Sequence, residues 1–232
     1  MKTTMKTTMK TKLFLSMLTI AIGFTACKKD SPDPVVETVI TETVTELDAT
    51  AETFVPNPPG PPIITGDYTK FSFSEGGIVE GDNWDIAFRN SKIIVNGGTD
   101  ADTSQPNRTG DAAAYIIDGE MADITSVNEA LLMQDGDNTS MYGTSAIIDD
   151  QGWEVLGWAR YDEGNMQSGI WPSLEPASGK ILVFRTYDGN HYAKIEILNF
   201  YSDWTPHSPF PSYGGFYTFN YVYQSEEGNT TF

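Results

Sequence analysis

The chain of 232 residues contains few side chains of the types that do chemistry, and their spacing matches no common catalytic site. Cys27 is the only cysteine, which rules out an intramolecular disulfide and any zinc site built from several cysteines. Of the two histidines, His191 lies beside an Asp-Gly-Asn turn and His207 lies in a proline-rich loop. Both are predicted to face solvent, so neither is placed to serve as the base of a nucleophile and base pair.

The acidic residues do not form a recognisable site either. The stretch Asp135-Gly136-Asp137-Asn138 resembles a calcium loop, but the EF-hand pattern needs Gly and Glu where this chain has Ser140 and Ala146. A solvated acidic loop is the favoured interpretation. No nucleophile elbow, zinc-protease helix or phosphate loop occurs in the sequence. We therefore expect a binding protein and not an enzyme, with an acid-dependent hydrolase as the remotest alternative.

The N-terminus has the layout of an export signal. Residues 1–12 carry only positive charge, and residues 13–24 are mostly apolar, too few to remain as a membrane-spanning helix. The tetrapeptide Phe24-Thr25-Ala26-Cys27 resembles a bacterial lipobox, which predicts a lipoprotein signal peptide over residues 1–26 and lipidation at Cys27. Two acyl chains would anchor the protein stably in a membrane. The alternative is a buried cysteine behind an ordinary signal peptide.

Residues 27–64 differ in composition from the rest of the chain. They combine acidic residues and a Thr/Val/Glu stretch with a proline cluster around Pro58, which together predict an acidic, proline-rich tether. The Val35–Leu47 stretch also has strand propensity, so an edge strand is the alternative there. Without the leader, ten basic residues face 32 acidic ones, a net charge of −22. This balance disfavours nucleic acid as a partner.

From Tyr68 onward, short strands and turns prevail over helical periodicity. The clearest hairpin spans Lys180–Tyr201 around Asp188-Gly189-Asn190, with Ile195 and Ile197 on one face of its second strand. In Phe216–Gln224 four aromatic residues alternate with polar ones, a pattern that fits core packing better than a ligand platform. We expect an all-β, antiparallel β-sandwich-like domain over residues 65–232, with short helical insertions, one of them near residues 127–134.

Several blocks of this domain, taken in order, resemble the HmuY-like haem-binding lipoproteins of the Bacteroidetes. They are Phe71-Ser72-Phe73-Ser74, Asn83-Trp84-Asp85-Ile86-Ala87-Phe88-Arg89, Asn96-Gly97-Gly98, Arg185-Thr186-Tyr187-Asp188-Gly189, Tyr192-Ala193-Lys194-Ile195 and Phe216-Tyr217-Thr218-Phe219-Asn220-Tyr221. The resemblance implies an outer-membrane lipoprotein, on the cell surface or the periplasmic face. It would capture haem and pass it to a TonB-dependent outer-membrane receptor for iron acquisition.

The resemblance also implies two axial ligands to the haem iron from loops in the middle of the domain. The corresponding stretch has no histidine, but Met141 and Met166 lie there in polar, Gly-rich loops, and a thioether is a ligand for haem iron. Gap filling is the alternative use of both methionines, and Met133 is expected in the core. Tyr142 and Trp171 are candidate walls of the haem pocket, with Trp153, Trp158 and Tyr161 as further aromatics and Arg160 as a partner for the propionates.

A second hypothesis explains the same composition without haem. A tethered, acidic, aromatic-rich β domain also fits a lipoprotein that binds a glycan or another nutrient. Only the resemblance and the two loop methionines separate this hypothesis from the first.

Overall fold

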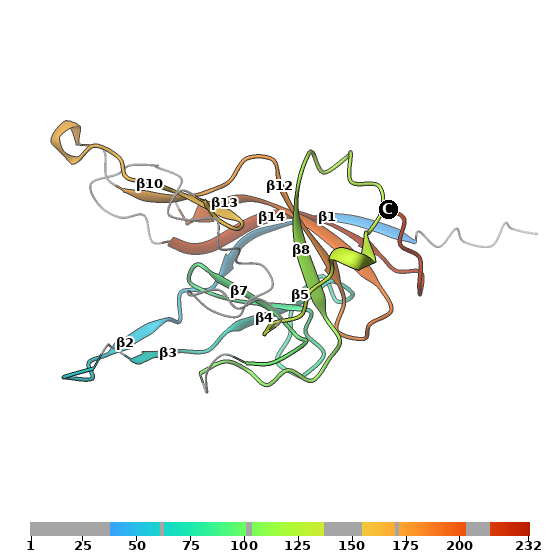
Figure 1. Ribbon diagram of the computed structural model, residues 1–232, viewed down its shortest axis with the longest axis horizontal. Coiled ribbons are helices and arrows are strands. Elements are labelled where there is room, and N and C mark those ends of the chain that lie inside the picture. The colour runs from blue at the N-terminus through green and yellow to red at the C-terminus, as the bar shows by residue number, and fades with distance from the viewer. Residues whose placement is uncertain (1–37, 61–62, 101–103, 137–154, 170–171, 203–213) are drawn as a thin grey trace, which may run out of the picture. The chain divides into compact units, whose positions relative to one another are not determined.

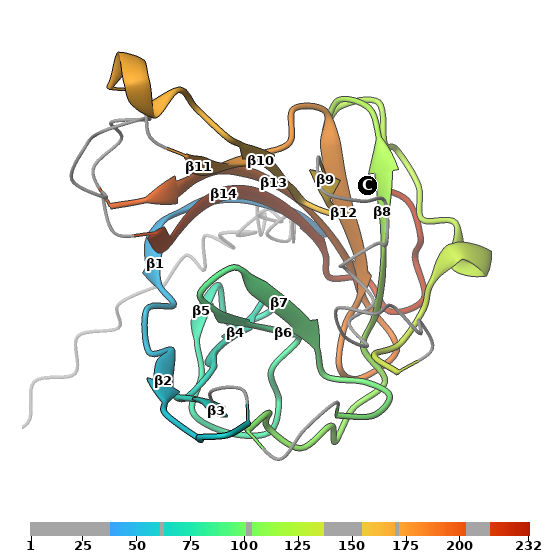
Figure 2. The ribbon, with the colours of Figure 1, turned by 60° about the vertical axis from the view of Figure 1, so that its left-hand side comes forward.

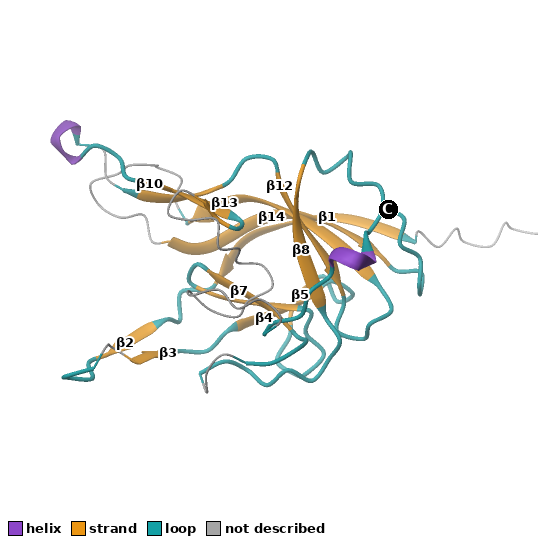
Figure 3. Ribbon diagram, in the orientation of Figure 1, coloured by secondary structure: helices purple, strands orange, loops and turns teal. Residues whose placement is uncertain are grey.

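Strands make up most of the regular structure of the protein (Figures 1 and 3), which confirms the predicted all-β class. The computed structural model describes residues 38–60, 63–100, 104–136, 155–169, 172–202 and 214–232. The helical structure within these ranges consists of two 3-10 turns, η1 (Glu129–Leu131) and η2 (Met166–Ser168). No helix in the described part of the chain is long and apolar enough to cross a membrane.

The larger sheet has five antiparallel strands in the order β1-β14-β13-β12-β8. Their bounds are β1 Val39–Asp48, β14 Gly214–Gln224, β13 Tyr192–Tyr201, β12 Lys180–Arg185 and β8 Ala113–Asp118. Strands β12 and β13 form the predicted hairpin, in which Leu182 pairs with Ile195. Gly189 in its turn has a φ of +77°, a conformation that glycine adopts without strain.

The smaller sheet has four strands in the order β5-β4-β6-β7, and the larger sheet curves over it (Figure 2). Their bounds are β5 Gly77–Ile78, β4 Thr69–Ser72, β6 Ile86–Arg89 and β7 Lys92–Val95. All four residues of β6 are buried, as expected for a strand with side chains packed on both faces. The two sheets form a sandwich.

Aromatic side chains fill the interior between the two sheets. Tyr217, Phe219 and Tyr221 of β14 are buried there, which confirms core packing for that aromatic face. Phe219 meets Phe71 of β4 edge to face, with ring centroids 5.5 Å apart. Phe88 of β6 lies 4.7 Å from the ring of Tyr217. Such pairs add specificity to the apolar burial that stabilises the sandwich.

The opposite face of the larger sheet is covered in part, around Lys194. Lys194 of β13 points there, yet it is buried, and its Nζ donates hydrogen bonds to the carbonyls of Met121 (2.8 Å) and Ile124 (2.7 Å). Phe232, the last residue, places its ring centroid 4.7 Å from the same Nζ. The segment after β8 and the C-terminus therefore shield this part of the face from water.

The tether predicted over residues 27–64 differs from the structure from Val39 onward. Residues 39–48 form the edge strand β1, which pairs with β14 along most of its length. Leu47 is buried in the core, and Ile40 and Val44 pack against it. Composition favoured a tether, but the spacing of these apolar side chains allows the stretch to close the edge of the sandwich.

The proline cluster is not a continuous spacer either. It connects β2 (Thr53–Val55) to β3 (Ile63–Thr65), a hairpin that forms a two-stranded sheet of its own. Figure 1 shows this hairpin projecting from the end of the sandwich that β1 reaches at Asp48. The prolines occupy its connecting loop, where no sheet hydrogen bonds are required of them.

Candidate functional site

A small three-stranded sheet carries the region in which the methionine ligands are expected. Its strands are β9 (Val155–Leu156), β10 (Ala159–Asp162) and β11 (Ser173–Pro176), in the order β11-β10-β9. The backbone N–H of Leu174 in β11 donates to the hydroxyl of Tyr201 in β13 at 2.9 Å, which fixes this sheet to the larger one. The 3-10 turn η2 lies between β10 and β11 at the tip (Figure 1).

Met166 begins this turn and is exposed to solvent over 65% of its surface. The side chain of Asn165 caps the turn by accepting from the N–H of Ser168 at 3.2 Å. Gly169 ends the turn with a φ of +77°, and its N–H donates to the carbonyl of Met166. Local polar residues therefore build the turn and leave the thioether at the surface, so gap filling in the core does not explain Met166.

Two other predictions for this region are wrong. Met133 was expected in the core, but it is 38% exposed, because its backbone bridges the edge strand β8 at Ala114 and the side chain turns outward. Trp158, proposed as a pocket wall, is instead buried in the core against Phe200 and Tyr217. Its Nε1 donates to the carbonyl of Ser91 at 3.0 Å.

The remaining predicted site residues lie outside the part of the chain that the structure describes. They are Met141, the proposed second iron ligand, the pocket walls Tyr142 and Trp171, the further aromatic Trp153, and the lipidation site Cys27. Of the other candidates, Tyr161 is exposed on β10, next to Arg160. Arg160 Nη2 lies 3.1 Å from Glu175 Oε2 in an exposed ion pair. Because exposed ion pairs contribute little to stability, the carboxylate of a ligand could replace Glu175 as the partner of Arg160 at little cost.

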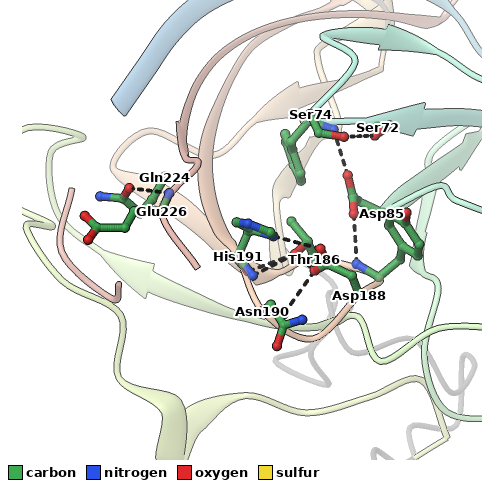
Figure 4. A network of polar contacts seen from close by, with 11 residues as sticks. Ser72, Ser74, Asp85, Thr186, Asp188, Asn190, His191, Gln224 and Glu226 are labelled. Atoms are coloured by element: carbon green, nitrogen blue, oxygen red, sulfur yellow. Dashed lines mark hydrogen bonds and ion pairs between the residues drawn. The ribbon is translucent and has the colours of Figure 1, made fainter. Parts of the chain in front are cut away.

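The residues that carry the family resemblance meet around a buried carboxylate, Asp85 (Figure 4). Its Oδ2 accepts from the backbone N–H of Phe73 at 2.7 Å, and its Oδ1 accepts from the N–H of Tyr187 at 2.8 Å. Phe73 follows β4 of the smaller sheet, whereas Tyr187 lies in the β12–β13 turn of the larger one. Asp85 thus joins the two layers of the sandwich.

Burial raises the pKa of Asp85 to about 6, although the two backbone hydrogen bonds counteract this effect. Asp188, in the same polar network, is less deeply buried than Asp85. Burial alone raises its pKa, but hydrogen bonds from Thr186, Asn190 and His191 outweigh burial and lower the pKa below its ordinary value. His191 Nδ1 lies 2.7 Å from Asp188 Oδ2, so this histidine, predicted to face solvent, is part of the turn's polar network.

The Asn-Gly-Gly block is a second structural junction. Asn96 donates to the carbonyls of Asp82 (2.7 Å) and Trp84 (2.9 Å), and it accepts from the N–H of Thr109 (2.8 Å). A Cβ on Gly97 would lie 1.9 Å from the carbonyl oxygen of Ala112. Only glycine therefore allows these two backbone segments to lie so close together.

A buried ion pair, which sequence reasoning missed, fixes the chain ahead of the segment that carries Met141. Arg108 Nη2 lies 2.9 Å from Asp135 Oδ2, and both side chains are almost fully buried. Asp135 also accepts from the N–H of Val95 at 3.0 Å. The predicted solvated acidic loop is therefore wrong at Asp135. Arg108 lies in a loop of ordinary polar composition, so the sequence holds no local signal for the pair.

The described residues hold no group of three or more His, Cys, Asp or Glu side chains that could bind a metal ion. What this region offers is an exposed neutral thioether on a firmly capped turn, a donor that suits haem iron. It also offers the guanidinium of Arg160 on β10, the strand that precedes this turn in the chain.

The sequence of the chain is similar to that of a known protein family. No curated protein matches the chain. The sequence profile of the HmuY protein family matches residues 65–214, which is most of the sandwich and includes the three-stranded sheet. The chain is therefore a member of the HmuY family.

Proposed function

We propose that this protein binds haem and does not catalyse a reaction, with Met166 and Met141 as axial ligands of the iron. Membership of the HmuY family, which is associated with haem binding, supports the ligand class. The observation that carries the site is the exposure of the Met166 side chain on a turn that is held by the Asn165 cap and by backbone hydrogen bonds. Gap filling in the core, the usual role of methionine, does not explain an apolar side chain that is exposed to water.

Neutral thioethers favour ferrous over ferric iron when compared with imidazole, so tighter binding is expected under reducing conditions. Without the leader, the net charge of −22 opposes the approach of a dianionic haem, so the propionates point into water or pair with Arg160. We further propose that lipidation at Cys27 anchors the protein in the outer membrane, where it passes haem to a TonB-dependent receptor for iron acquisition.

The test is a haemin titration of the chain from Glu37 to Phe232, with and without dithionite, followed by absorbance. Met166→Ala and Met141→Ala are each expected to weaken binding at least about ten-fold, or ~1.4 kcal/mol. Both should also change the low-spin ferrous bands. Met133→Ala is the matched control, because Met133 is also exposed but lies on a different segment. Its affinity should equal that of the wild type.

The other outcomes are equally definite. Saturable binding with the same affinity in both variants and in the wild type would support haem as the ligand but would show that Met166 and Met141 are not its site. An absence of saturable binding in either redox state would overturn the haem proposal. The glycan or other nutrient module would then be the better hypothesis.

A further inference from the structure

The hairpin β2–β3 and the described part of its loop, residues 53–60 and 63–65, form a projection that we call the proline arm. Val55 and Ile63 face each other across its two strands and are 43% and 51% exposed. The described loop residues Pro56–Gly60 are exposed as well. No charged residue occurs from Thr53 to Gly66, although the whole chain has a net charge of −18. The arm is an uncharged, apolar projection on an acidic protein.

The base of the arm is firmly held. A Cβ on Gly66 would lie 1.8 Å from the carbonyl oxygen of Ala51, so the two ends of the arm are in close backbone contact. Arg89, buried at the end of β6, donates from Nη1 to the carbonyl of Gly66 at 3.1 Å. Its guanidinium also lies 4.3 Å from the ring centroid of Tyr68. Because the base is fixed, a partner would meet the arm with little loss of conformational entropy.

A cavity of about 600 Å³ lies beside this base, and we call it the arm-base cavity. Three carboxylates line it, those of Asp48, Asp67 and Glu80, together with the apolar side chains of Ile78 and Val79. Lys70 is the only basic residue of the lining, and its Nζ donates to the carbonyl of Gly81 at 3.2 Å. Carboxylates beside apolar walls match the charged head and the aliphatic stem of an arginine or lysine side chain.

We propose that the proline arm and the arm-base cavity form one docking surface for a protein. The partner would offer an apolar groove to the arm and insert an arginine or lysine side chain into the cavity. Proline-rich segments suit such grooves, and the acidic surroundings favour a basic rim on the partner. The arm and η2 project from the same end of the sandwich in Figures 1 and 2. If the proposed function holds, this partner is placed to receive haem.

Two other occupants fit the surface less well. A lipid bilayer prefers Trp, Tyr, Lys and Arg at its interface, and none of these occurs from Thr53 to Gly66. The carboxylates at the base would also repel anionic lipid headgroups. A second copy of the chain carries the same negative charge and would be repelled.

The first test is photo-crosslinking of the full chain in the cells that produce it. Benzoylphenylalanine at position 63 is expected to crosslink to one protein. The same probe at position 198 should not, because Leu198 is similarly exposed (44%) but lies on β13, outside the arm. Failure to find a crosslink specific to position 63 would overturn the proposal.

The second test measures binding of that purified partner to variants of the arm and the cavity. Ile63→Asp and Asp67→Lys are each expected to weaken binding at least about ten-fold. Leu198→Asp and Glu227→Lys are the matched controls for the apolar and the charge change, and should leave affinity within about two-fold. Rising salt should weaken wild-type binding. Equal affinities of all four variants would contradict the docking surface.

Four further measurements separate the alternatives and control for folding. Co-sedimentation with vesicles of phosphatidylethanolamine and phosphatidylglycerol that Ile63→Asp abolishes would indicate a membrane and overturn the protein partner. Self-association in sedimentation velocity that the same variant abolishes would indicate a second copy, with the same consequence. Circular dichroism checks that the variants fold. Haemin binding should be unchanged in Ile63→Asp, so a failure of haem binding in the wild type counts against the proposed function and not against this surface.

Discussion

Asp85 shows how a single residue can hold two sheets together at the expense of burying a charge. It accepts one backbone hydrogen bond from each layer, and it lies in the interior of the sandwich. Water would solvate the ionised carboxylate better than these two donors do, so the pKa rises to about 6. The residue that links the layers is therefore also a source of pH dependence.

We predict that Asp85→Asn removes a pH-dependent part of the stability. Because the folded pKa of about 6 exceeds the ordinary value of 3.8, the folded state binds the proton more tightly than the unfolded state. The contribution of protonated Asp85 to the stability of the folded state is fully present below about pH 4 and is lost as the pH rises through about 6. Relative to the variant, the free energy of unfolding of the wild type should fall by up to about 3 kcal/mol between pH 4 and pH 7.5.

Urea unfolding of both chains across this pH range measures the effect. The asparagine also leaves one backbone N–H facing its amide group, a cost of roughly 1–3 kcal/mol that does not vary with pH. The informative quantity is therefore the change of the difference between the two chains with pH. A difference that stays constant from pH 4 to pH 7.5 would show that Asp85 is not the titrating group.

A second prediction at the residue scale concerns Gly97. The space available for a side chain, and not the backbone conformation, restricts this position to glycine. Gly97→Ala would bring a Cβ within 1.9 Å of the carbonyl oxygen of Ala112, so one backbone segment must move. We expect a loss of about 1–3 kcal/mol in the free energy of unfolding, the usual cost of overpacking. Gly77→Ala is the control, since its nearest neighbour is the carbonyl oxygen of Glu75 at 3.9 Å. Equal stability of the two variants in urea would refute the close approach.

At the scale of elements, the C-terminal residues act as a latch on the outer face of the larger sheet. The N–H of Phe232 donates to the carbonyl of Thr125 at 3.0 Å, and Thr231 bridges Ser126. Lys194 reaches the same region from β13 and lies over the ring of Phe232. The latch therefore connects the end of the chain, the segment after β8 and the larger sheet.

We predict that Phe232→Ala destabilises the fold by about 1–2 kcal/mol, less than the loss for a fully buried phenylalanine because the ring is only partly covered. Phe232→Leu keeps the apolar contact but lacks the aromatic face, so it should cost no more than about 1 kcal/mol. Thermal unfolding of the three chains ranks them. Wild-type stability in Phe232→Ala would show that the latch does not contribute to folding.

The elements differ in how far the sequence predicts them. The β12–β13 hairpin and the aromatic face of β14 follow from local alternation, and both are confirmed. An edge strand at β1 was only the alternative to a tether, because its pairing partner, β14, lies 168 to 185 residues further along the chain, and no local pattern reports so distant a contact. The buried pair of Arg108 and Asp135 escaped notice because the two residues are 27 positions apart and the loop that carries Arg108 has an ordinary polar composition. Met166 and Met141 were proposed as haem ligands from the family resemblance, and both assignments stay predictions.

At the scale of the whole molecule, the sandwich needs the stretch that composition assigned to a tether. The family match begins at residue 65, but the compact unit begins at Glu37. Without β1, the edge of β14 would be unpaired, and the core around Tyr217 and Phe219 would lose Leu47 and the flanking Ile40 and Val44. A long, aromatic-rich edge strand without its neighbour is also prone to aggregate.

We therefore predict that a chain from Glu37 to Phe232 folds cooperatively, whereas a chain from Ala49 to Phe232 does not. Burial of each large apolar side chain contributes about 1.5–3 kcal/mol, so loss of β1 removes a large share of the roughly 5–15 kcal/mol that stabilises a domain. The control keeps β1 but replaces residues 54–64 with a short glycine linker, because the proline arm pairs only within itself among the described strands. It should unfold in urea within about 1 kcal/mol of the longer chain. Equal urea midpoints for the chains that begin at Glu37 and at Ala49 would mean that β1 rests on a finished sandwich without stabilising it.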